Sequence, residues 1–282
     1  MLSDLLTLVS QHFQYDLSAY KSNFIERRIQ ARLHDLGLNK IEEYLPYIRA
    51  NENELQHFQK GSLIGVTAFF RDPEAFHALK KDIIPTLLRN TCFGDVLRIW
   101  VPACSSGEEV YTIAMLIQEC MHEMDHYPAV KIFATDFNED AIKKASAGIY
   151  STDIEISVNS KRLEQFFIKK QATYTVKKQI RNMVIFSKQN LINDPPFTKI
   201  DLISCRNLII YFNGTLQNKI ISVFNYCLKN EGILFLGSSE SILGQSNLFK
   251  TLSHKWKIYQ KNERTSYLEA ALNFPTRYRT FA

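Results

Sequence analysis

The stretch Val96–Met121, VLRIWVPACSSGEEVYTIAMLIQECM, changes its apolar period within a few residues. A β-branched apolar run ends at Pro102, a loop of small residues follows up to Gly107, and apolar residues then recur at helical spacing. Such a strand, loop and helix N-terminus form a ligand site when the loop exposes backbone N–H groups. Glu108 and Glu109 disfavour a phosphate here, so the pattern indicates a ligand that is neutral or cationic at that end. The alternative is an ordinary turn in which both glutamates stabilise the helix dipole.

Composition is typical of a globular protein from a reducing compartment. With 282 residues and 45% hydrophobic content, the chain can bury one large core or two smaller ones. Its five cysteines are scattered, with no C-x-x-C pair and no metal-ligand spacing with histidine. No apolar run approaches the roughly 18 residues of a membrane span, and the N-terminus lacks the basic segment of a secretory signal. We therefore expect a cytoplasmic protein without membrane insertion and without a bound metal.

The net charge of +5 is unevenly distributed along the chain. Counting Lys and Arg against Asp and Glu gives −6 for residues 61–160, which hold the opening loop, and +7 for residues 161–188. The acidic segment argues against a polyanion lying across the loop. The basic segment could meet an acidic protein, a nucleic acid or only water, and a solvated face is the commonest fate of such charge.

Residues 1 to about 90 have the apolar spacing of helices. The expected helices are Leu5–Phe13, Ser22–Leu36, Ile41–Arg49 and Asn53–Phe58. On the second helix, Arg28 and Arg32 lie four residues apart and share a face, next to Arg27. That face is either solvated or a docking surface for an acidic partner. Asp72 is expected to cap a further helix that begins at Pro73 and runs to about Leu88.

From Val96 onward, short apolar strands alternate with helices, which is typical of a doubly wound α/β sheet covered on both faces. The expected strands are Leu97–Val101, Val130–Thr135, Met183–Phe186, Ile200–Cys205 and Ile233–Leu236, followed by an antiparallel pair near Leu248–Leu252 and Trp256–Tyr259. The long crossover before Met183 contains the alternating run Tyr174–Ile180, which predicts a small antiparallel β-subdomain at about residues 165–182. The predicted divisions are a helical domain over 1–75, an α/β domain over 76–265 and a peripheral tail over 266–282.

Asp136 ends the second expected strand, at the edge of the sheet where ligands bind in such folds. A carboxylate there can accept both ribose hydroxyls of a nucleoside, while a nearby glutamate pairs with an ammonium group. S-adenosylmethionine has this combination of a nucleoside and a cationic end. The 29 residues from Gly107 to Asp136 exceed the roughly 20 of a dinucleotide fold, and a long first helix explains the difference. A purely capping role for Asp136 is the alternative.

Two further motifs are interpreted as structural. Cys104 and Cys205 follow strands that are neighbours in such sheets, and we expect both to be small packing residues because no histidine is placed to activate either thiol. Asp194–Phe197, DPPF, matches a signature of methyltransferases that act on adenine amino groups. In those enzymes it follows the fourth strand, whereas here it precedes that strand, so we interpret it as a rigid connecting loop.

Six motifs occur in order along the chain: TAFFRDP (Thr67–Pro73), RIWVPACSSGEEVYTIAM (Arg98–Met115), IFATD (Ile132–Asp136), KQNL (Lys188–Leu191), DLISCRNLIIYF (Asp201–Phe212) and ILFLGSSES (Ile233–Ser241). Taken together, they resemble the motifs of the chemotaxis receptor methyltransferase family, the CheR type. The resemblance covers nearly the whole chain, and several motifs are most similar to the methyltransferase domains fused to methylesterase and sensor modules. It implies a class I methyltransferase (Rossmann-like) sheet with an all-helical N-terminal domain and a β-subdomain insertion.

The resemblance implies an enzyme that transfers a methyl group from S-adenosylmethionine to glutamate side chains, giving methyl esters and S-adenosylhomocysteine. The implied partner is the cytoplasmic coiled coil of a chemoreceptor or a similar acidic helical protein, with no nucleic acid, and we expect a monomer. The implied cofactor-binding residues are Thr67, Arg71, Glu109, Asp136, Asn190, Leu191, Arg206 and Asn207. Arg71 and Tyr211 match residues near the transferring methyl group, and Arg27, Arg28 and Arg32 lie on the helix that faces the receptor.

Three departures from the family pattern bear on this expectation. Gly65 stands where members usually have Asn, so one polar cofactor contact should be missing, and Val110 replaces a common Pro or Ala. Lys169–Arg181 lacks the glycine-rich loop of members that hold a receptor's C-terminal tail, which argues against tail docking. Two alternatives stay open: a non-catalytic module that binds S-adenosylmethionine for regulation, and a nucleic-acid methyltransferase, which the acidic pocket segment disfavours.

Overall fold

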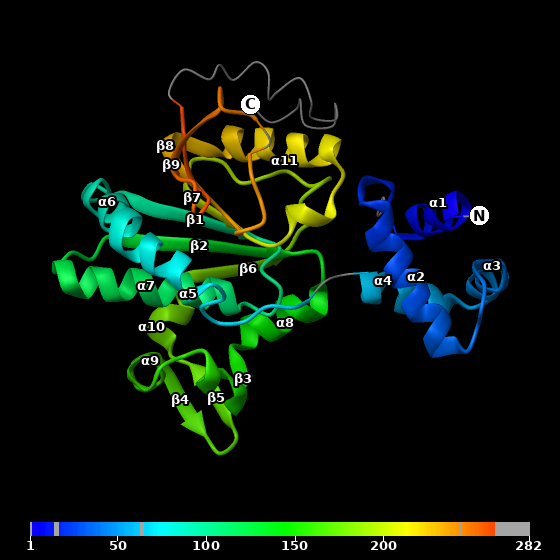
Figure 1. Cartoon of the computed structure of the whole chain (residues 1–282). Coiled ribbons are helices and arrows are strands. Elements are labelled where there is room, and N and C mark those ends of the chain that lie inside the picture. Colours follow the sequence, from blue (N-terminus) through cyan, green and yellow to red (C-terminus); the bar gives the residue numbers. More distant parts are fainter. Residues whose placement is uncertain (1, 14–16, 63–64, 243, 263–282) are drawn as a thin grey trace. The chain divides into compact units, whose positions relative to one another are not determined.

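The computed structural model describes residues 2–13, 17–62, 65–242 and 244–262. The chain forms two compact units (Figure 1): residues 1–64 together with 208–218, and residues 65–207 together with 219–282. The predicted domain boundary near residue 75 stays a prediction, and the predicted tail at 266–282 lies outside the described residues. Among the helices of the described ranges, none is both long and apolar enough to cross a membrane.

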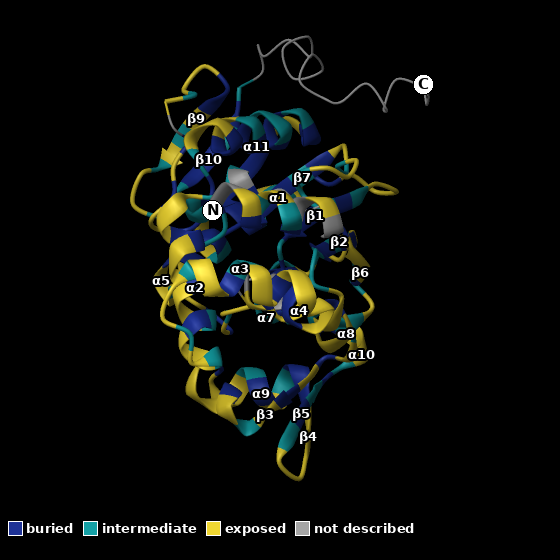
Figure 2. Cartoon of the chain, turned by 90° about the vertical axis from the view of Figure 1, so that its right-hand side faces the viewer, coloured by how far each residue is buried: buried dark blue, intermediate teal, exposed yellow. Residues whose placement is uncertain are grey.

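The first unit is helical, as predicted. Its N-terminal elements are α1 (Leu2–Phe13), the 3-10 turn η1 (Leu17–Ala19), α2 (Ser22–Leu36), α3 (Ile41–Ala50) and α4 (Glu52–Ser62). Helix α2 buries Phe24, Ile25, Ile29 and Leu33 on one side, and Figure 2 shows exposed residues along its outer surface. It ends at Gly37, whose φ of 68° is the left-handed conformation that glycine adopts without a steric penalty. Residues 208–218 join this unit through an antiparallel bridge between Tyr20 and Phe212.

The second unit is built on a seven-stranded sheet with the order β6-β2-β1-β7-β8-β10-β9. The strands are β1 (Val96–Pro102), β2 (Ala129–Asp136), β6 (Val184–Lys188), β7 (Ile200–Cys205), β8 (Leu228–Leu236), β9 (Phe249–Ser253) and β10 (Ile258–Lys261). The strands from β6 to β8 pair in parallel, and β10 pairs antiparallel with both β8 and β9. The doubly wound sheet and its antiparallel end are therefore confirmed. β8 begins five residues before the predicted strand, and the apolar pattern missed this part because residues 229–231 are polar and exposed.

The helices of this unit cover the sheet. They are α5 (Pro73–Ala78), the π-helical turn η2 (Leu79–Ile83), α6 (Ile84–Arg89), α7 (Glu108–Met124), α8 (Glu139–Ala147) and α11 (Gly214–Cys227), which begins in residues of the first unit. The strands lie between α11 and the pair α7 and α8 (Figure 1). The predicted helix from Pro73 to Leu88 is interrupted by the π turn. Pro85 explains the interruption, because it has no N–H to donate to the carbonyl four residues earlier.

The predicted β-subdomain is present as a separate three-stranded antiparallel sheet with the order β3-β5-β4. Its elements are β3 (Ile149–Ser151), the 3-10 turn η3 (Thr152–Ile156), α9 (Ser160–Phe166), β4 (Phe167–Lys170), β5 (Thr173–Val176) and α10 (Lys178–Arg181). The expectation of a strand through Ile180 was wrong, since the strand ends at Val176. Ile180 is fully buried in the helical turn α10, which packs against α7.

Candidate functional site

The loop after β1 is shaped to expose its backbone at the edge of the sheet. Ala103, Ser105 and Gly107 all have positive φ, of 53°, 50° and 93°. A Cβ atom on Gly107 would come within 2.9 Å of the Ala145 Cβ, so only glycine fits there. The loop is tied to β2 because the Cys104 N–H donates to the Thr135 carbonyl at 2.9 Å. The geometry agrees with the predicted tight strand-to-helix loop.

Asp136 holds this loop and the start of α8 with one carboxylate. Its Oδ2 accepts from the Ser105 N–H at 2.8 Å, and its Oδ1 accepts from the Asn138 N–H at 2.7 Å. Burial raises the pKa of Asp136, and the backbone hydrogen bonds oppose that rise. Asn138, not Asp136, caps α8 through its side chain. A carboxylate has about four lone-pair sites, so Asp136 retains acceptor capacity for ligand hydroxyls.

Glu109 is a largely buried carboxylate, with a side chain 15% exposed, and it is incompletely paired. Its Oε1 accepts from the Ser204 hydroxyl at 2.7 Å, and its Oε2 lies 3.5 Å from Nη1 of Arg206. Burial raises the pKa of Glu109 above its ordinary value, although Arg206 and Ser204 favour the ionised form. Glu240 adds to the rise through charge repulsion. A cation placed near Glu109 would offset this unfavourable burial.

Arg206 connects the end of β7 to the segment that carries Arg71. Its guanidinium is fully buried and donates to the Arg71 carbonyl at 3.0 Å and to the Asp72 carboxylate at 2.8 Å. It lies over the rings of Phe76 and Phe235, at 4.7 and 4.9 Å from their centroids. These contacts fix the main chain of Arg71.

The prediction that Asp72 caps the following helix was wrong. Its φ of 60° is left-handed, and its side chain makes no capping hydrogen bond. The carboxylate instead pairs with Arg206, a buried cation that needs a partner more than an exposed helix end does.

Asn207 and Glu240 complete the turn after β7. The Glu240 carboxylate is buried and accepts from the N–H groups of Asn207, at 2.9 Å, and Gly237, at 2.7 Å. A Cβ on Gly237 would come within 2.7 Å of that carboxylate, so the close approach requires glycine. Asn207 itself has a φ of 60°. Glu240 and Ser204 were missed from the sequence although both lie in quoted motifs, because a polar residue beside an apolar strand does not reveal its partner.

The segment from Gly65 to Arg71 is anchored by aromatic packing and one buried hydrogen bond. Phe69 packs edge-on against Tyr150, and the Phe70 N–H donates to the Thr112 hydroxyl at 3.1 Å. The Arg71 side chain is exposed and, among the described residues, donates only to the Val66 carbonyl, at 3.1 Å. Thr67 is half-buried within this segment. The segment is attached to the loop after β1 through the Gly65 carbonyl and to the residue after β7, Arg206, through the Arg71 carbonyl.

Gly65 lies beside the loop after β1. Its carbonyl accepts from the Ser105 hydroxyl at 3.3 Å, and a Cβ there would meet Ser105 at an ordinary 3.7 Å. A larger side chain would therefore fit at position 65. Lack of space is therefore not the reason why this chain has glycine at position 65, and the missing polar cofactor contact there stays a prediction.

The chain after β6 carries Asn190 and Leu191 to the same edge. Residue Lys188 of β6 pairs with Asp136 in the register of the sheet, and the Gln189 N–H donates to the Asp136 carbonyl at 3.0 Å. The Asp194 carboxylate accepts from the Asn190 N–H at 2.7 Å, so the DPPF motif begins by holding this turn. Phe197 ends the motif stacked on Phe133, which is consistent with a rigid connecting loop.

The two cysteines behave as expected of packing residues. Cys104 and Cys205 are 3% and 0% exposed; Cys104 follows β1 and Cys205 ends β7, and these two strands are neighbours in the sheet. Burial raises the pKa of both thiols, which disfavours the nucleophilic thiolate.

The remaining predicted residues belong to the first unit. Tyr211 lies in residues 208–218, whereas Arg71 lies in the second unit, so their proximity stays a prediction. Arg27 is exposed, and Arg28 lies over the Phe24 ring at 5.2 Å. Arg32 is bound by Glu54 through two hydrogen bonds of 2.9 and 2.6 Å and by Asp35 at 2.9 Å. Arg32 is therefore less available to a partner than its neighbours.

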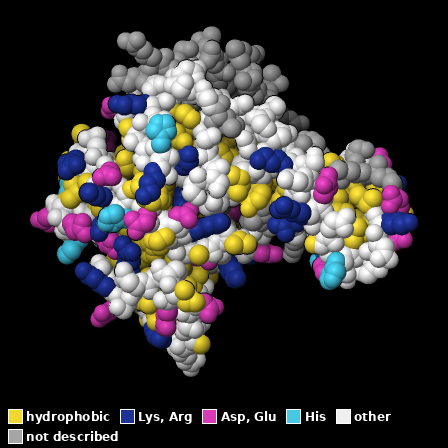
Figure 3. All heavy atoms as spheres, in the orientation of Figure 1, with side chains coloured by type: hydrophobic (Ala, Val, Ile, Leu, Met, Phe, Trp, Pro, Cys, Tyr) yellow, Lys and Arg dark blue, Asp and Glu magenta, His cyan; other side chains and the backbone are white. Residues whose placement is uncertain are grey.

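On the face that Figure 3 shows, the cations of the basic insertion do not form a continuous surface. Several of its cations pair with acids, as in Lys169 with Glu155 at 2.9 Å and Arg162 with Glu119 at 2.7 Å. Figure 3 shows Lys and Arg interspersed with Asp and Glu over the visible face. This mixed surface favours the solvated interpretation over a nucleic-acid interface.

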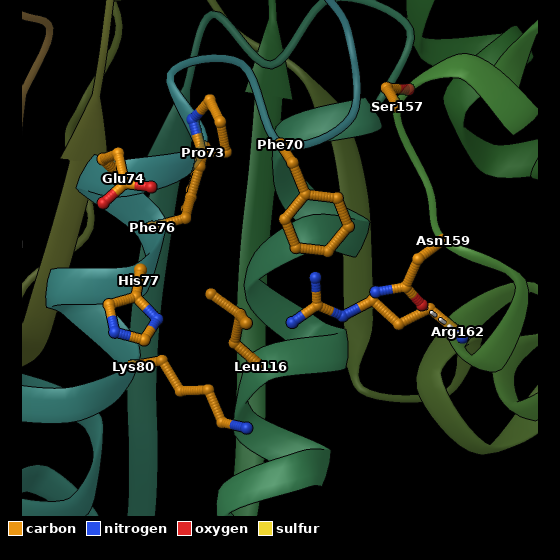
Figure 4. A pocket seen from close by; sticks show the side chains of 10 residues that line it. All are labelled: Phe70, Pro73, Glu74, Phe76, His77, Lys80, Leu116, Ser157, Asn159 and Arg162. Atoms are coloured by element: carbon orange, nitrogen blue, oxygen red, sulfur yellow. Dashed lines mark hydrogen bonds between the residues drawn. The ribbon is translucent and has the colours of Figure 1, made fainter.

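A cavity of about 280 Å³ lies beside the segment that carries Arg71 (Figure 4), since its lining residue Phe70 directly precedes Arg71 and its lining residue Phe76 lies under the Arg206 guanidinium. Its lining includes Phe70, Phe76, Lys80 and Leu116, together with Arg162 from α9. The Arg162 guanidinium lies 4.1 Å from the centroid of the Phe70 ring. The cavity contains none of the eight residues expected to bind the cofactor, and it therefore does not mark that site.

Five of the eight predicted cofactor-binding residues thus lie at or just after the ends of strands: Asp136, Asn190, Leu191, Arg206 and Asn207. Glu109 lies in the first turn of α7, after the loop that follows β1, and Thr67 and Arg71 lie in the segment that Arg206 holds through the Arg71 carbonyl. The donor set fits S-adenosylmethionine: Asp136 offers acceptors for ribose hydroxyls, and Glu109 offers an undercompensated negative charge for an ammonium group. Non-glycine residues with positive φ gather here, at Phe70, Asp72, Ala103, Ser105 and Asn207. Such strained backbone often accompanies functional sites.

Comparison with known proteins agrees with this arrangement. The model of the CheR methyltransferase all-alpha domain matches residues 1–60, and that of the CheR methyltransferase SAM binding domain matches residues 65–258. A chemotaxis protein methyltransferase of Borreliella burgdorferi is 35% identical over 257 residues, covering 88% of this chain and 90% of its own. The chemotaxis protein methyltransferase of Salmonella typhimurium is 32% identical over 257 residues, covering 87% and 84%. An uncharacterised 104.1 kDa protein of Rhodobacter capsulatus is 34% identical over 92% of this chain, which spans only 27% of that protein's length.

Proposed function

Because the chain belongs to the CheR methyltransferase family, we propose that it transfers methyl groups from S-adenosylmethionine to glutamate side chains of a chemoreceptor-like signalling protein. The observation that carries the proposal is the pair of carboxylates at the sheet edge, Asp136 with spare acceptor capacity and Glu109 buried without full compensation. The names of relatives that match over most of their length, including the Borreliella methyltransferase, support the receptor as substrate.

The cofactor contacts follow from the charges of these residues. Asp136 accepts the ribose hydroxyls, and Glu109, held by Ser204, faces the ammonium group of the methionine end. Thr67, Asn190, Leu191 and Asn207 line the remainder of the site. Arg206 stays structural within it, because its guanidinium is buried and occupied by Arg71 and Asp72.

The reaction needs little proton transfer from the protein. A glutamate substrate is already ionised at pH 7, since its ordinary pKa is about 4.3. When bound, the cofactor supplies a methyl group that a sulfonium has already activated. The chain's own residues therefore have to hold the acceptor carboxylate in line, a positioning effect worth roughly 7–11 kcal/mol in favourable cases.

Arg71 is the residue that we assign to holding the acceptor. Its main chain is fixed by Arg206, while its guanidinium is exposed and makes one hydrogen bond within the part of the chain that the structure describes, to the Val66 carbonyl. A guanidinium can bind a carboxylate through two parallel hydrogen bonds. Too strong a contact would stabilise the ground state and slow transfer, so a freely placed side chain suits this role. Tyr211 is assigned beside the transferring methyl group on the resemblance.

The proposal is tested by incubating the protein with labelled methyl donor and candidate receptor fragments, followed by alkali treatment of the labelled product. A glutamate methyl ester releases its label in alkali, whereas methylated nucleic acid does not. Cofactor binding without any labelled receptor fragment would favour the regulatory module. Salt-sensitive binding to polynucleotide with alkali-stable label would favour the nucleic-acid enzyme.

Two variants separate the assigned roles. Asp136→Ala should abolish cofactor binding in calorimetry, because the ribose and the loop at Ser105 lose the same carboxylate. Arg71→Ala should lower turnover while leaving cofactor affinity partly intact, because its main-chain carbonyl still accepts from Arg206. Unchanged cofactor affinity in Asp136→Ala would falsify the ribose assignment.

A further inference from the structure

The feature that the proposed function leaves unused is the packing of Tyr211 inside the helical unit. Although Tyr211 follows β7 in sequence, residues 208–218 belong to the unit formed by residues 1–64. The Tyr211 ring lies 5.2 Å from the Phe24 ring of α2, centroid to centroid. Helix α2 is the same helix that carries Arg27 and Arg28. The residue assigned to methyl transfer and the helix assigned to receptor contact are thus parts of one unit.

The main chain around Tyr211 is fixed from both sides. The Lys21 N–H donates to the Tyr211 carbonyl at 2.9 Å, and the Asn213 N–H donates to the Ala19 carbonyl at 2.8 Å. On the other side, the buried Gln217 amide donates to the carbonyls of Ile209 and Phe212, at 2.6 and 3.0 Å. The turn that carries Tyr211 therefore has little freedom, and the orientation of its ring depends on what the ring contacts.

The ring of Phe24 contacts Tyr20, Tyr211 and the half-buried cation Arg28. Tyr20 stacks on Phe24 at 5.4 Å, and Phe24 contacts Tyr211. The guanidinium of Arg28 lies 5.2 Å from the centroid of Phe24. Residues 24 and 28 are one helical turn apart, so they share a face of α2. Arg28 is half-buried, whereas its neighbour Arg27 is exposed and has no ring contact among the described residues.

We propose that Phe24 and Arg28 are positioning residues for Tyr211. An acidic helical substrate that binds Arg28 then acts on the orientation of the Tyr211 ring through the ring of Phe24, which contacts both residues. The proposal rests on the proposed function for the role of Tyr211. A carboxylate on the substrate would attract the Arg28 guanidinium, whose attraction to the ring of Phe24 is a modest cation–π contact. A shift of the Arg28 guanidinium then changes its contact with the Phe24 ring, which in turn contacts the Tyr211 ring. Substrate binding and the placement of a transfer residue are thereby linked through two side chains.

The kinetic test compares Phe24→Leu with the wild-type protein at saturating cofactor and receptor fragment. Leucine keeps an apolar side chain at position 24 but removes the ring that contacts Tyr211. We expect kcat to fall about tenfold, the effect of a barrier change of about 1.4 kcal/mol, with the receptor KM and the cofactor Kd nearly unchanged. In a Tyr211→Phe background the same substitution should cost much less. An unchanged kcat, or an equal loss in both backgrounds, would overturn the proposal.

A second readout does not depend on activity. In protein labelled with 3-fluorotyrosine, the Tyr211 resonance is assigned by its loss in Tyr211→Phe, and an acidic helical receptor fragment is then added. We expect the fragment to shift the Tyr211 resonance in the wild-type protein and in Arg27→Gln, and to leave it unshifted in Arg28→Gln at a fragment concentration that saturates each variant. An equal shift in Arg28→Gln would contradict the link.

These measurements distinguish failure of the inference from failure of the proposed function. If no receptor fragment becomes methylated in the wild-type protein, the proposed function fails, while the resonance shift still reports on the contact through Arg28. If methylation occurs and Tyr211→Phe leaves kcat unchanged, the role of Tyr211 fails and the positioning role fails with it.

Discussion

Each unit contains an arginine beside a largely buried glutamate and a third polar group, yet the pKa values of the two glutamates are shifted in opposite directions. In the helical unit, Glu54 accepts two hydrogen bonds from Arg32 and one from the Tyr44 hydroxyl at 2.8 Å, and Arg32 and Tyr44 lower its pKa despite burial. At the sheet edge, burial raises the pKa of Glu109.

The difference lies in how the arginine uses its donors. Arg32 directs two nitrogens at Glu54, whereas Arg206 donates to Arg71 and Asp72 and approaches Glu109 only at 3.5 Å. Both carboxylate oxygens of Glu54 are bound by Arg32, whereas Glu109 shares the cation Arg206 with Asp72 and so has less compensating positive charge. A structural ion pair and a ligand site can therefore contain the same residue types, and the distribution of hydrogen bonds separates them.

The largest expected effect comes from replacing each cluster's arginine in turn, Arg206 at the sheet edge and Arg32 in the helical unit. Arg206→Met should lower the free energy of unfolding by about 3 kcal/mol, because the largely buried Glu109 and the partly exposed Asp72 both lose the buried cation beside them. It should also abolish cofactor binding, because the Arg71 main chain loses its anchor. Arg32→Met is the matched control: it should reduce stability in urea unfolding but leave cofactor affinity in calorimetry unchanged. Equal losses of cofactor affinity in both variants would remove the distinction between the clusters.

The two glutamates should respond differently to neutralisation at pH 7. Glu54→Gln should destabilise the protein by about 2 kcal/mol, because one amide oxygen cannot replace both carboxylate oxygens that Arg32 binds. Glu109→Gln should change stability much less, since ionised Glu109 is penalised by burial, and should weaken cofactor binding about tenfold or more. A stability loss in Glu109→Gln as large as that in Glu54→Gln would show that both are structural pairs.

The pH dependence sharpens the contrast. The folded-state pKa of Glu54 is lowered, so its stabilisation is present above the ordinary value of about 4.3 and is lost as the pH falls below it. The pKa of Glu109 is raised, so its burial cost is relieved as the pH falls towards about 4.3, but its negative charge is lost there too. We expect calorimetric cofactor affinity to decline with falling pH while Glu54 is still ionised, and to decline less in Glu109→Gln. Affinity independent of pH down to about 4.3 would contradict the role of Glu109.

The smallest expected effect is at Ser204. Ser204→Ala removes the hydroxyl that donates to Glu109, a buried hydrogen bond worth about 1 kcal/mol, and should weaken cofactor binding roughly fivefold. The same change should raise the pKa of Glu109 further, and thus move the decline in affinity to higher pH. Cofactor affinity and its pH profile are measured together by calorimetry, and an unchanged profile would mean that Ser204 does not tune Glu109.

The sequence predicted those parts of the molecule that repeat a local pattern. The apolar runs identified the strands of the sheet, and the switch of period at Pro102 located the loop that Asp136 now holds. The family motifs named residues at one edge of the sheet. The apolar periodicity is a local property, and the family motifs are short stretches in a fixed order. Both can be recognised in one amino-acid sequence.

The rest depended on contacts between distant residues. Asp72 has the residue type of a helix cap, and only the buried Arg206, 134 positions later, explains why it does not cap. The opposite pKa shifts of Glu54 and Glu109 arise from donor geometry that no spacing encodes. Arg32 shares a helix face with Arg28 in sequence, but its partner Glu54 comes from another helix.

The grouping of residues 208–218 with the N-terminal helices has a practical consequence for dividing the protein into fragments. A fragment that ends near residue 62 would lack the chain that pairs with Tyr20 and covers Phe24, and the Lys21 N–H would lose its acceptor. A cut placed where the sequence changes from helices to strands is therefore not a cut between independent pieces. Receptor-binding studies on the isolated helices would measure a surface with part of its own packing removed.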